Sequence, residues 1–134
     1  MPGPVGALEE ALFNTLSDPS IAAAGASGVH NRIAPQGAAL PYVIVGWQGG
    51  GDENSSPRRA RNTLYTVQAL AETLDDAEAI DAALDALLHL GSLTVSGWSN
   101  FWMAREVDIA YQEVDPTGRP IFHSGGVYRI RMSH

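Results

Sequence analysis

Residues 32–47 read RIAPQGAALPYVIVGW and join two segments of opposite character. Residues 42–47 form a run of branched and aromatic side chains, which predicts a strand buried on both faces. Residues 34–40 consist mainly of proline, glycine and alanine and offer a core almost nothing to pack against. A turn predicted at residues 34–37 separates the strand from a shorter one at residues 29–33. The join raises the question of why a segment without packing groups leads directly into the most strand-like part of the chain.

More strands are predicted downstream of this segment. Residues 63–70 alternate between two sets of side chains, which is the period of a strand with two distinct faces. Asp-Pro-Thr-Gly at residues 115–118 predicts a turn, because proline presets its second position and glycine tolerates positive φ. This turn should fold the strand that ends near Val114 back onto residues 119–123. The other predicted strands are residues 93–95, 101–112 and 127–132.

Two amphipathic helices are predicted, at residues 5–16 and 74–90, with a single helical turn at residues 21–24 between them. Apolar residues three or four positions apart form the buried stripe of each helix. Gly91 is expected to cap the second helix at its C-terminal end. The first stripe consists of Val5, Leu8, Leu12 and Leu16. The second consists of Ala77, Ile80, Leu84, Leu87 and Leu88.

The order of these elements is helix, strands, helix, strands. Such an order predicts an α+β fold with a mostly antiparallel sheet and two helices packed on it. At 134 residues the chain has the length of one domain, so residues 1–134 are predicted to form a single unit with its own core.

The composition excludes several classes of function. The formal net charge is −7, whereas a dedicated DNA-binding surface is normally basic. An acidic wall past which nucleic acid slides without sticking remains compatible with this charge. The chain has no cysteine, so neither disulfides nor thiolate metal sites hold the fold. No secretory signal and no apolar run of the ~18 residues that a membrane helix needs is visible, so folding in the cytoplasm without membrane contact is expected.

No arrangement typical of an enzyme is visible. The four histidines are scattered, and no two of them have the spacing of a metal-binding pair. Asp85 and His89 are four residues apart on the predicted helix, which suits a solvated surface pair as well as a metal or acid–base site. Residues 49–51 are three glycines, but acidic residues follow them instead of the Gly-Lys-Ser/Thr of a phosphate-binding loop. We therefore expect no catalytic residue, no metal and no cofactor.

Residues 48–62 read QGGGDENSSPRRARN and contain no apolar anchor, so a long polar loop is predicted. Loops of this length inside a compact domain are uncommon and tend to be functional or disordered. With paired arms, about seven residues on each side would reach ~20 Å at ~3.3 Å per residue. The charges either meet complementary groups on a neighbouring subunit or are incidental to a solvated loop, and a DNA contact is a third alternative. The charged residues concerned are Asp52, Glu53, Arg58, Arg59 and Arg61.

The opening segment is the most distinctive part of a resemblance that covers nearly the whole chain. A short N-terminal helix, RIAPQGAALPYVIV, a long polar loop, a strand and an acidic amphipathic helix together resemble the phage tail-terminator, or tail-completion, family. The Ala-Pro-Gln-Gly-Ala-x-x-Pro-Tyr-Val sequence of residues 34–43 carries most of this likeness. The ending AREVDIAYQEVDPTGRPIFHSGGVYRIRM is similar to the closing strands of that family.

The resemblance implies a structural protein of the virion neck, with no catalytic residue and no cofactor. Subunits of this family close into a six-fold ring on the head-proximal end of the tail tube, where the ring stops tube polymerisation. The implied partners are other copies of this chain in a hexamer, the major tail tube protein, the head-side connector or stopper, and genomic DNA that passes through the ring without specific binding. Assembly is expected in the cytoplasm of a bacterial host, in a phage or in a phage-like particle such as a gene transfer agent.

Two sets of residues follow as candidates for assembly and for DNA passage. Two prolines stiffen the segment before the strand predicted at residues 42–47, and small residues between them let another backbone approach, so a rigid contact surface is predicted. The alternative is an ordinary crossover on the subunit surface. The predicted subunit or tube contacts are Pro35, Gln36, Gly37, Ala38, Pro41, Asp52, Glu53, Arg58, Arg59 and Arg61. The acidic side chains expected to face the channel and repel DNA are Glu78, Asp81 and Asp85.

Two other functions compete with this interpretation. A different neck protein, such as a head-completion or stopper subunit, would share the small size and the ring habit but would bind the portal complex. A small enzyme or ligand-binding domain would need a concave pocket with converging polar groups. Trp47, Trp98 and Trp102 could line such a pocket, although aromatic rings of this kind also belong in cores and interfaces.

Overall fold

The computed structural model describes residues 3–54 and 59–134, and it confirms the predicted α+β class. Five strands form one sheet, and the helical turn predicted at residues 21–24 is the short helix α2, which begins two residues earlier. The elements in chain order are α1 (Pro4–Leu16), α2 (Pro19–Ala23), β1 (Val29–Asn31), β2 (Tyr42–Asp52), β3 (Ala60–Ala71), α3 (Leu74–Leu88), β4 (Ser99–Val114) and β5 (Pro120–Ser133).

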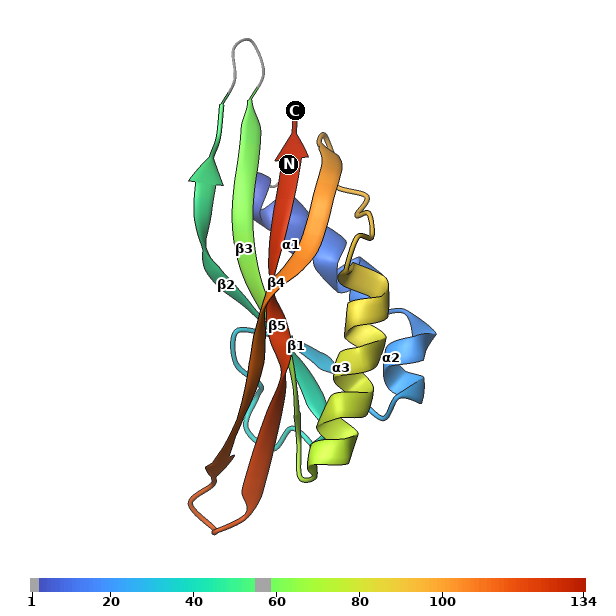
Figure 1. The fold of residues 1–134 in the computed structure, drawn as a ribbon, viewed down its shortest axis with the longest axis vertical. Helices are drawn as coiled ribbons and strands as arrows, with labels where there is room; N and C mark the ends of the chain where they lie inside the picture. The colour runs from blue at the N-terminus through green and yellow to red at the C-terminus, as the bar shows by residue number, and fades with distance from the viewer. Residues whose placement is uncertain (1–2, 55–58) are drawn as a thin grey trace.

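The sheet has the strand order β1-β2-β3-β5-β4. Among the described strands, β1 and β2 are parallel and the other neighbours are antiparallel, which confirms the largely antiparallel prediction. The β2–β3 and β4–β5 hairpins extend toward opposite ends of the long axis of the molecule (Figure 1). From the strand order, the two outer strands of the sheet are β1 and β4, and they lie on opposite sides of the subunit.

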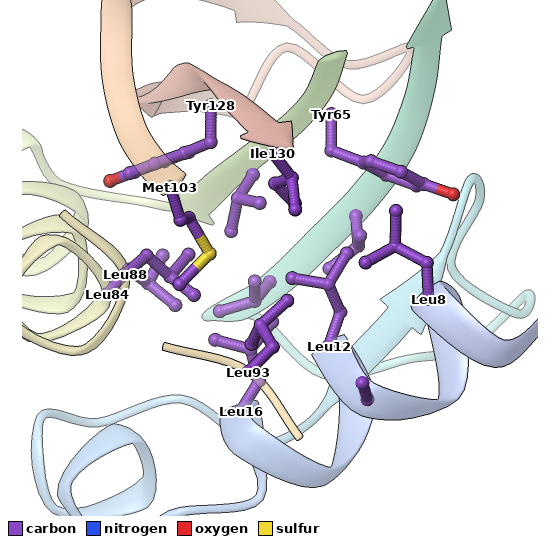
Figure 2. Packing of buried hydrophobic residues seen from close by; sticks show 14 of the residues in the cluster. Leu8, Leu12, Leu16, Tyr65, Leu84, Leu88, Leu93, Met103, Tyr128 and Ile130 are labelled. Carbon is purple, nitrogen blue, oxygen red and sulfur yellow. The ribbon is translucent and has the colours of Figure 1, made fainter. Parts of the chain in front are cut away.

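The core lies between one face of the sheet and the helices α1 and α3. Alternate side chains of β3 and β5, among them Tyr65, Tyr128 and Ile130, point toward the helices and are fully buried. Leucines of both helices and Met103 of β4 meet them in one cluster (Figure 2). Burying a leucine stabilises a fold by about 1.5–3 kcal/mol relative to leaving it exposed. This cluster fixes which face of the sheet the helices cover.

Both helices bury nearly the stripe that was predicted. In α1, Val5 is 36% exposed, and two alanines that were not predicted belong to the buried stripe. In α3, Leu87 lies at the margin of the core. None of the helices in the described ranges combines the length and the hydropathy needed to cross a membrane. The buried residues of α1 are Ala7, Leu8, Ala11, Leu12 and Leu16, and those of α3 are Ala77, Ile80, Leu84 and Leu88.

The C-terminal end of α3 differs from its prediction. The helix ends at Leu88, and Leu90 instead of Gly91 adopts the left-handed conformation, with φ of 58°. Gly91 is needed for space, because a Cβ there would overlap the carbonyl oxygen of Leu87. The sequence therefore located the glycine correctly but assigned it the wrong physical role.

The strand predicted at residues 93–95 is wrong. Leu93 and Val95 are buried in the core, but they lie in an irregular segment without strand pairing. Their alternation with polar residues reflects which side chains point inward, and this pattern is the same for a strand and for an extended segment that lies across a core.

The loop predicted at residues 48–62 is wrong in extent, because strands occupy most of the described part. β2 continues to Asp52, which lies opposite Arg61 of β3. Gly50 has φ of +113°, and a Cβ at this position would overlap the backbone of the facing strand. The glycines thus permit two backbones to approach closely instead of marking a loop. Residues 55–58 lie outside the described residues.

Leu84→Ala tests the position of the core. Leu84 is fully buried, so its truncation should lower the free energy of unfolding by about 2–5 kcal/mol. Leu74 lies on the same helix and is 46% exposed, so Leu74→Ala should change that free energy by about 0.5 kcal/mol or less. Denaturant unfolding followed by circular dichroism measures both changes. Equal losses would show that α3 packs through a different face.

Candidate functional site

The proline segment, defined as residues 34–41, crosses from β1 to β2 on the surface of the subunit. Ser27 holds its far end twice: its N–H donates to the carbonyl oxygen of Pro41 at 2.8 Å, and its hydroxyl donates to that of Ala39. A turn with Gly37 at φ of +86° shapes its middle. The backbone is thus fixed although the side chains have little to pack against. Among its predicted contact residues, Pro35, Gln36 and Gly37 are exposed, and Ala38 and Pro41 are half-buried.

The charged residues of the β2–β3 hairpin pair with one another inside the subunit. Asp52 accepts hydrogen bonds from Arg59 at 3.2 Å and from Arg61 at 2.7 Å. These bonds hold the pKa of the Asp52 carboxyl below its ordinary value, and the bond from Arg59 has the largest effect. Glu53 pairs with Arg131 of β5 at 3.3 Å. These charges satisfy each other across the hairpin, so they are less available to a neighbouring subunit than the sequence suggested. Arg58 lies outside the described residues.

The structure does not bring the proline segment and the charged hairpin residues together. They lie at opposite ends of β2, which has 11 residues. At about 3.4 Å per residue this length separates them by roughly 30 Å. The two predicted contact regions are therefore separate surfaces.

The three acidic residues of α3 that are predicted to face a channel differ in exposure, because Asp81 and Asp85 are half-buried. The side chain of Asp81 is 13% exposed and pairs with Arg105 of β4 at 2.7 Å. Asp85 accepts a hydrogen bond from the Tyr128 hydroxyl at 3.0 Å. Glu78 is exposed, so of the three it keeps its charge toward solvent. The helix turns this flank toward β4 and β5 because its apolar stripe is anchored in the core.

Arg105 is the centre of a polar network that the sequence analysis missed. Its guanidinium also contacts Asp108 at 2.8 Å and donates to the carbonyl oxygen of Gly125 at 2.6 Å. The hydrogen bonds to Asp81 raise the pKa of Arg105 above its ordinary value. The side chain lies across Gly126, where a Cβ would meet it at 2.7 Å. The glycine pair between the segments predicted at residues 119–123 and 127–132 was the available signal, because glycines within a strand often mark a close approach.

The hollow beside Arg105 has a volume of about 450 Å³ and is lined mainly by charged side chains. At the rim of this hollow, Nδ1 of His89 accepts a hydrogen bond from the Arg105 backbone N–H at 3.2 Å. One backbone N–H on the outer edge of β4 therefore has a partner. Within the described residues, no group of three or more histidine, aspartate or glutamate side chains is arranged to hold a metal ion. The arrangement serves to fasten α3 to the sheet.

A second polar cluster surrounds His123 on the face of the sheet that the helices leave uncovered. The imidazole is 5% exposed and stacks on Tyr111 with ring centroids 4.1 Å apart. Its Nε2 lies 2.7 Å from a Glu113 oxygen, and its Nδ1 lies 3.2 Å from the side-chain oxygen of Gln68. Burial, followed by the charge of Glu113, raises the pKa of the Tyr111 hydroxyl. The cluster ties β4 to β5 and β3.

Strand β4 exposes several large apolar side chains. Trp102 is 44% exposed, whereas Trp47 and Trp98 are half-buried against the core, so the three tryptophans do not line one pocket. A β-bulge lies between Asn100 and Trp102. The exposed large apolar residues of this strand are Phe101, Trp102, Val107, Tyr111 and Val114.

Comparison with known proteins identifies the family of this chain. The family model described as "Tail completion protein gp17" matches residues 10–118, a range that includes the proline segment, the β2–β3 hairpin and α3. A search of curated proteins found no significant match.

Among solved structures, a chain of the "Virion of native gene transfer agent (GTA) particle" is similar to this one, with a TM-score of 0.80 and 20% sequence identity over 100% of both chains. At this identity the likeness shows a shared fold. The family match covers most of the sequence and confirms the resemblance inferred from residues 34–43. The chain belongs to the tail completion protein gp17 family, whose members are structural tail proteins and not enzymes.

Proposed function

We propose that copies of this chain form a ring, expected to be a hexamer, that caps the head-proximal end of a tail tube in a virion. In this position the ring stops tube polymerisation and joins the tail to the head-side connector. The family match over residues 10–118 carries the proposal. The similarity of the whole chain to a component of a gene transfer agent virion supports it, because that fold belongs to an assembled particle.

The arrangement of the sheet suits a ring. A closed ring of identical subunits needs two different surfaces that fit each other, one on each side of the subunit. The outer strands β1 and β4 belong to different sides of the sheet and have different surfaces, since β1 continues into the proline segment and β4 exposes aromatic side chains. Tube protein would contact a third surface, for which the charged hairpin residues Asp52, Glu53, Arg59 and Arg61 are the candidates.

The charge distribution suits passage of DNA through such a ring. Because Arg105 neutralises Asp81, the free negative charge of α3 comes from Glu78 and from the exposed Asp75 and Asp76 in its first turn. We expect this end of α3 to face the channel. A wall with excess negative charge repels the phosphate backbone and keeps DNA mobile.

Loss of this chain should release control of tube length. Particles made by cells in which its coding sequence is deleted should carry tubes of variable and increased length, detached from heads, when measured by electron microscopy. Tubes of normal length that fail to join heads would instead indicate a head-completion or stopper protein. Restoring the unaltered chain from a plasmid is the control.

Ala39→Trp should block assembly without unfolding the subunit. Ala39 is an exposed residue of the proline segment. Substitution of Gly37 would introduce backbone strain because its φ is +86°, and substitution of Ala39 avoids this strain. We expect at least a tenfold fall in the amount of this chain in purified particles, and a change in Tm of about 2 °C or less for the isolated chain. Ala23→Trp on the exposed end of α2 is the matched control. Normal incorporation of Ala39→Trp would contradict a contact at this segment.

Glu78→Arg tests whether α3 faces the channel. Reversal of an exposed charge on the channel wall should hold DNA by attraction to phosphate and lower DNA delivery several-fold, while particle yield stays constant. Glu10→Arg makes the same change on the exposed side of α1. Delivery measured per assembled particle should fall for the first variant and not for the second. Equal delivery by both variants would remove α3 from the channel.

A further inference from the structure

We propose that residues 33–41 of one copy pack against the beginning of β4 in the next copy, on Phe101 and Trp102. This pairing rests on the proposed ring and adds to it the two surfaces that meet. It assigns the neighbouring subunit as the partner of the proline segment, and the tube protein as the partner of other surfaces.

The beginning of β4 presents two aromatic rings on one face. The bulge before Trp102 places Phe101 and Trp102 together opposite Arg131 of β5, whose guanidinium lies 5.3 Å from the Phe101 ring centroid. The two residues are 53% and 44% exposed. Exposed aromatic side chains gathered on an outer strand are typical of a surface that a partner covers.

Charge limits where two copies can touch. Each copy has a net charge of −7, and every arginine that the structure describes is already ion-paired within its own subunit. Contact between copies is therefore favoured where carboxylates are absent. The two longest stretches without Asp, Glu, Lys, Arg or His are residues 33–51 and 90–104. In the first stretch, Ile33 is 80% exposed beside the proline segment, and Gln48 and Gly50 are exposed at its other end. In the second stretch, the exposed large apolar residues are Leu90, Phe101 and Trp102, and only the last two are neighbours on β4.

The position of these two surfaces suits contact between copies and not within one. The proline segment adjoins β1 and the rings lie on β4, and these are the opposite outer strands of the sheet (Figure 1). Four steps of about 4.8 Å between strands separate β1 from β4 by roughly 19 Å. The register adds about 27 Å along the strands, because Tyr42 lies level with His123 of β5 whereas Trp102 lies level with Arg131, so the two surfaces are at diagonally opposite corners of the sheet. Two different, complementary patches on opposite sides generate head-to-tail contacts, which close into a ring when neighbouring copies are related by a rotation without a rise along its axis.

The chemistry of the two surfaces is complementary. Proline-rich segments dock on aromatic side chains in known recognition grooves, because a stiff backbone loses little freedom on binding. Pro35 and Pro41 supply such groups, and small residues between them allow flat rings to approach closely. The hydrogen bonds from Ser27 fix the segment before any contact is made.

Paired cysteines test the contact directly, because the chain has no cysteine of its own. Cells should make particles in which the sole copy of this chain carries Ala39→Cys and Ser99→Cys, which leave both aromatic rings in place. Treatment of purified particles with a short bismaleimide should give a ladder of covalent multimers on a reducing gel. The ladder should end at the number of subunits in the ring.

Three controls make the outcomes separable. Each single-cysteine variant should stay monomeric, and Asn14→Cys with Ser99→Cys should give at least tenfold less multimer, because Asn14 lies on the exposed side of α1. Particles that contain the chain and have normal tube length but give no ladder would overturn this pairing and leave the proposed ring intact. Absence of the chain from particles would overturn both.

Removal of the rings provides a second measurement. Phe101→Ser with Trp102→Ser should lower incorporation into particles at least tenfold while the isolated subunit keeps its Tm, since both side chains are exposed. Val107→Ser, at a 55% exposed position farther along the same strand, is the matched control and should be incorporated normally. Equal incorporation of all these variants would overturn the pairing.

Discussion

Burial of one face of the sheet beneath α1 and α3 determines what every other surface of the subunit can do. Tyr65 of β3 and Tyr128 of β5 point into this layer and are almost fully buried with the leucines of both helices (Figure 2). Because the helices occupy this face, the opposite face and the two outer strands remain for contacts with other molecules. A structural tail protein needs such a division, since its core must be complete before its edges meet a partner.

The charges of the subunit follow the same division. Arg105 lies where the helix layer meets the sheet and fastens α3 to β4 and β5 through Asp81 and the Gly125 carbonyl oxygen. The described arginines of the β2–β3 hairpin are likewise used inside the subunit, where they pair with Asp52. What remains on the surface is an excess of carboxylates and a few uncharged areas. This distribution disfavours random association of copies and restricts close contact to the uncharged areas.

The proline segment answers the question raised by its sequence. No side chain of residues 34–41 belongs to the core of its own subunit, yet Ser27 and an internal turn fix their backbone. The segment crosses the surface between β1 and β2, as the interpretation as an ordinary crossover requires. Hydrogen bonds also hold its backbone, and this stiffness is what the interpretation as a contact surface requires. A crossover between parallel strands has to pass over the outside of the sheet, so its composition reflects that path as well as any contact that it makes.

The sequence by itself determined the fold class, the two main helices, most strands and the family, because these depend on periodic burial and on a local motif that each segment carries alone. The proline segment was recognisable for the same reason. Only the tertiary structure decided that residues 48–52 pair as a strand, that Leu93 and Val95 enter the core without pairing, and that Asp81 faces Arg105. Each of these depends on a partner far away in the chain. Periodicity records which side chains are apolar and at what spacing, whereas pairing depends on which distant groups the packed core brings within reach.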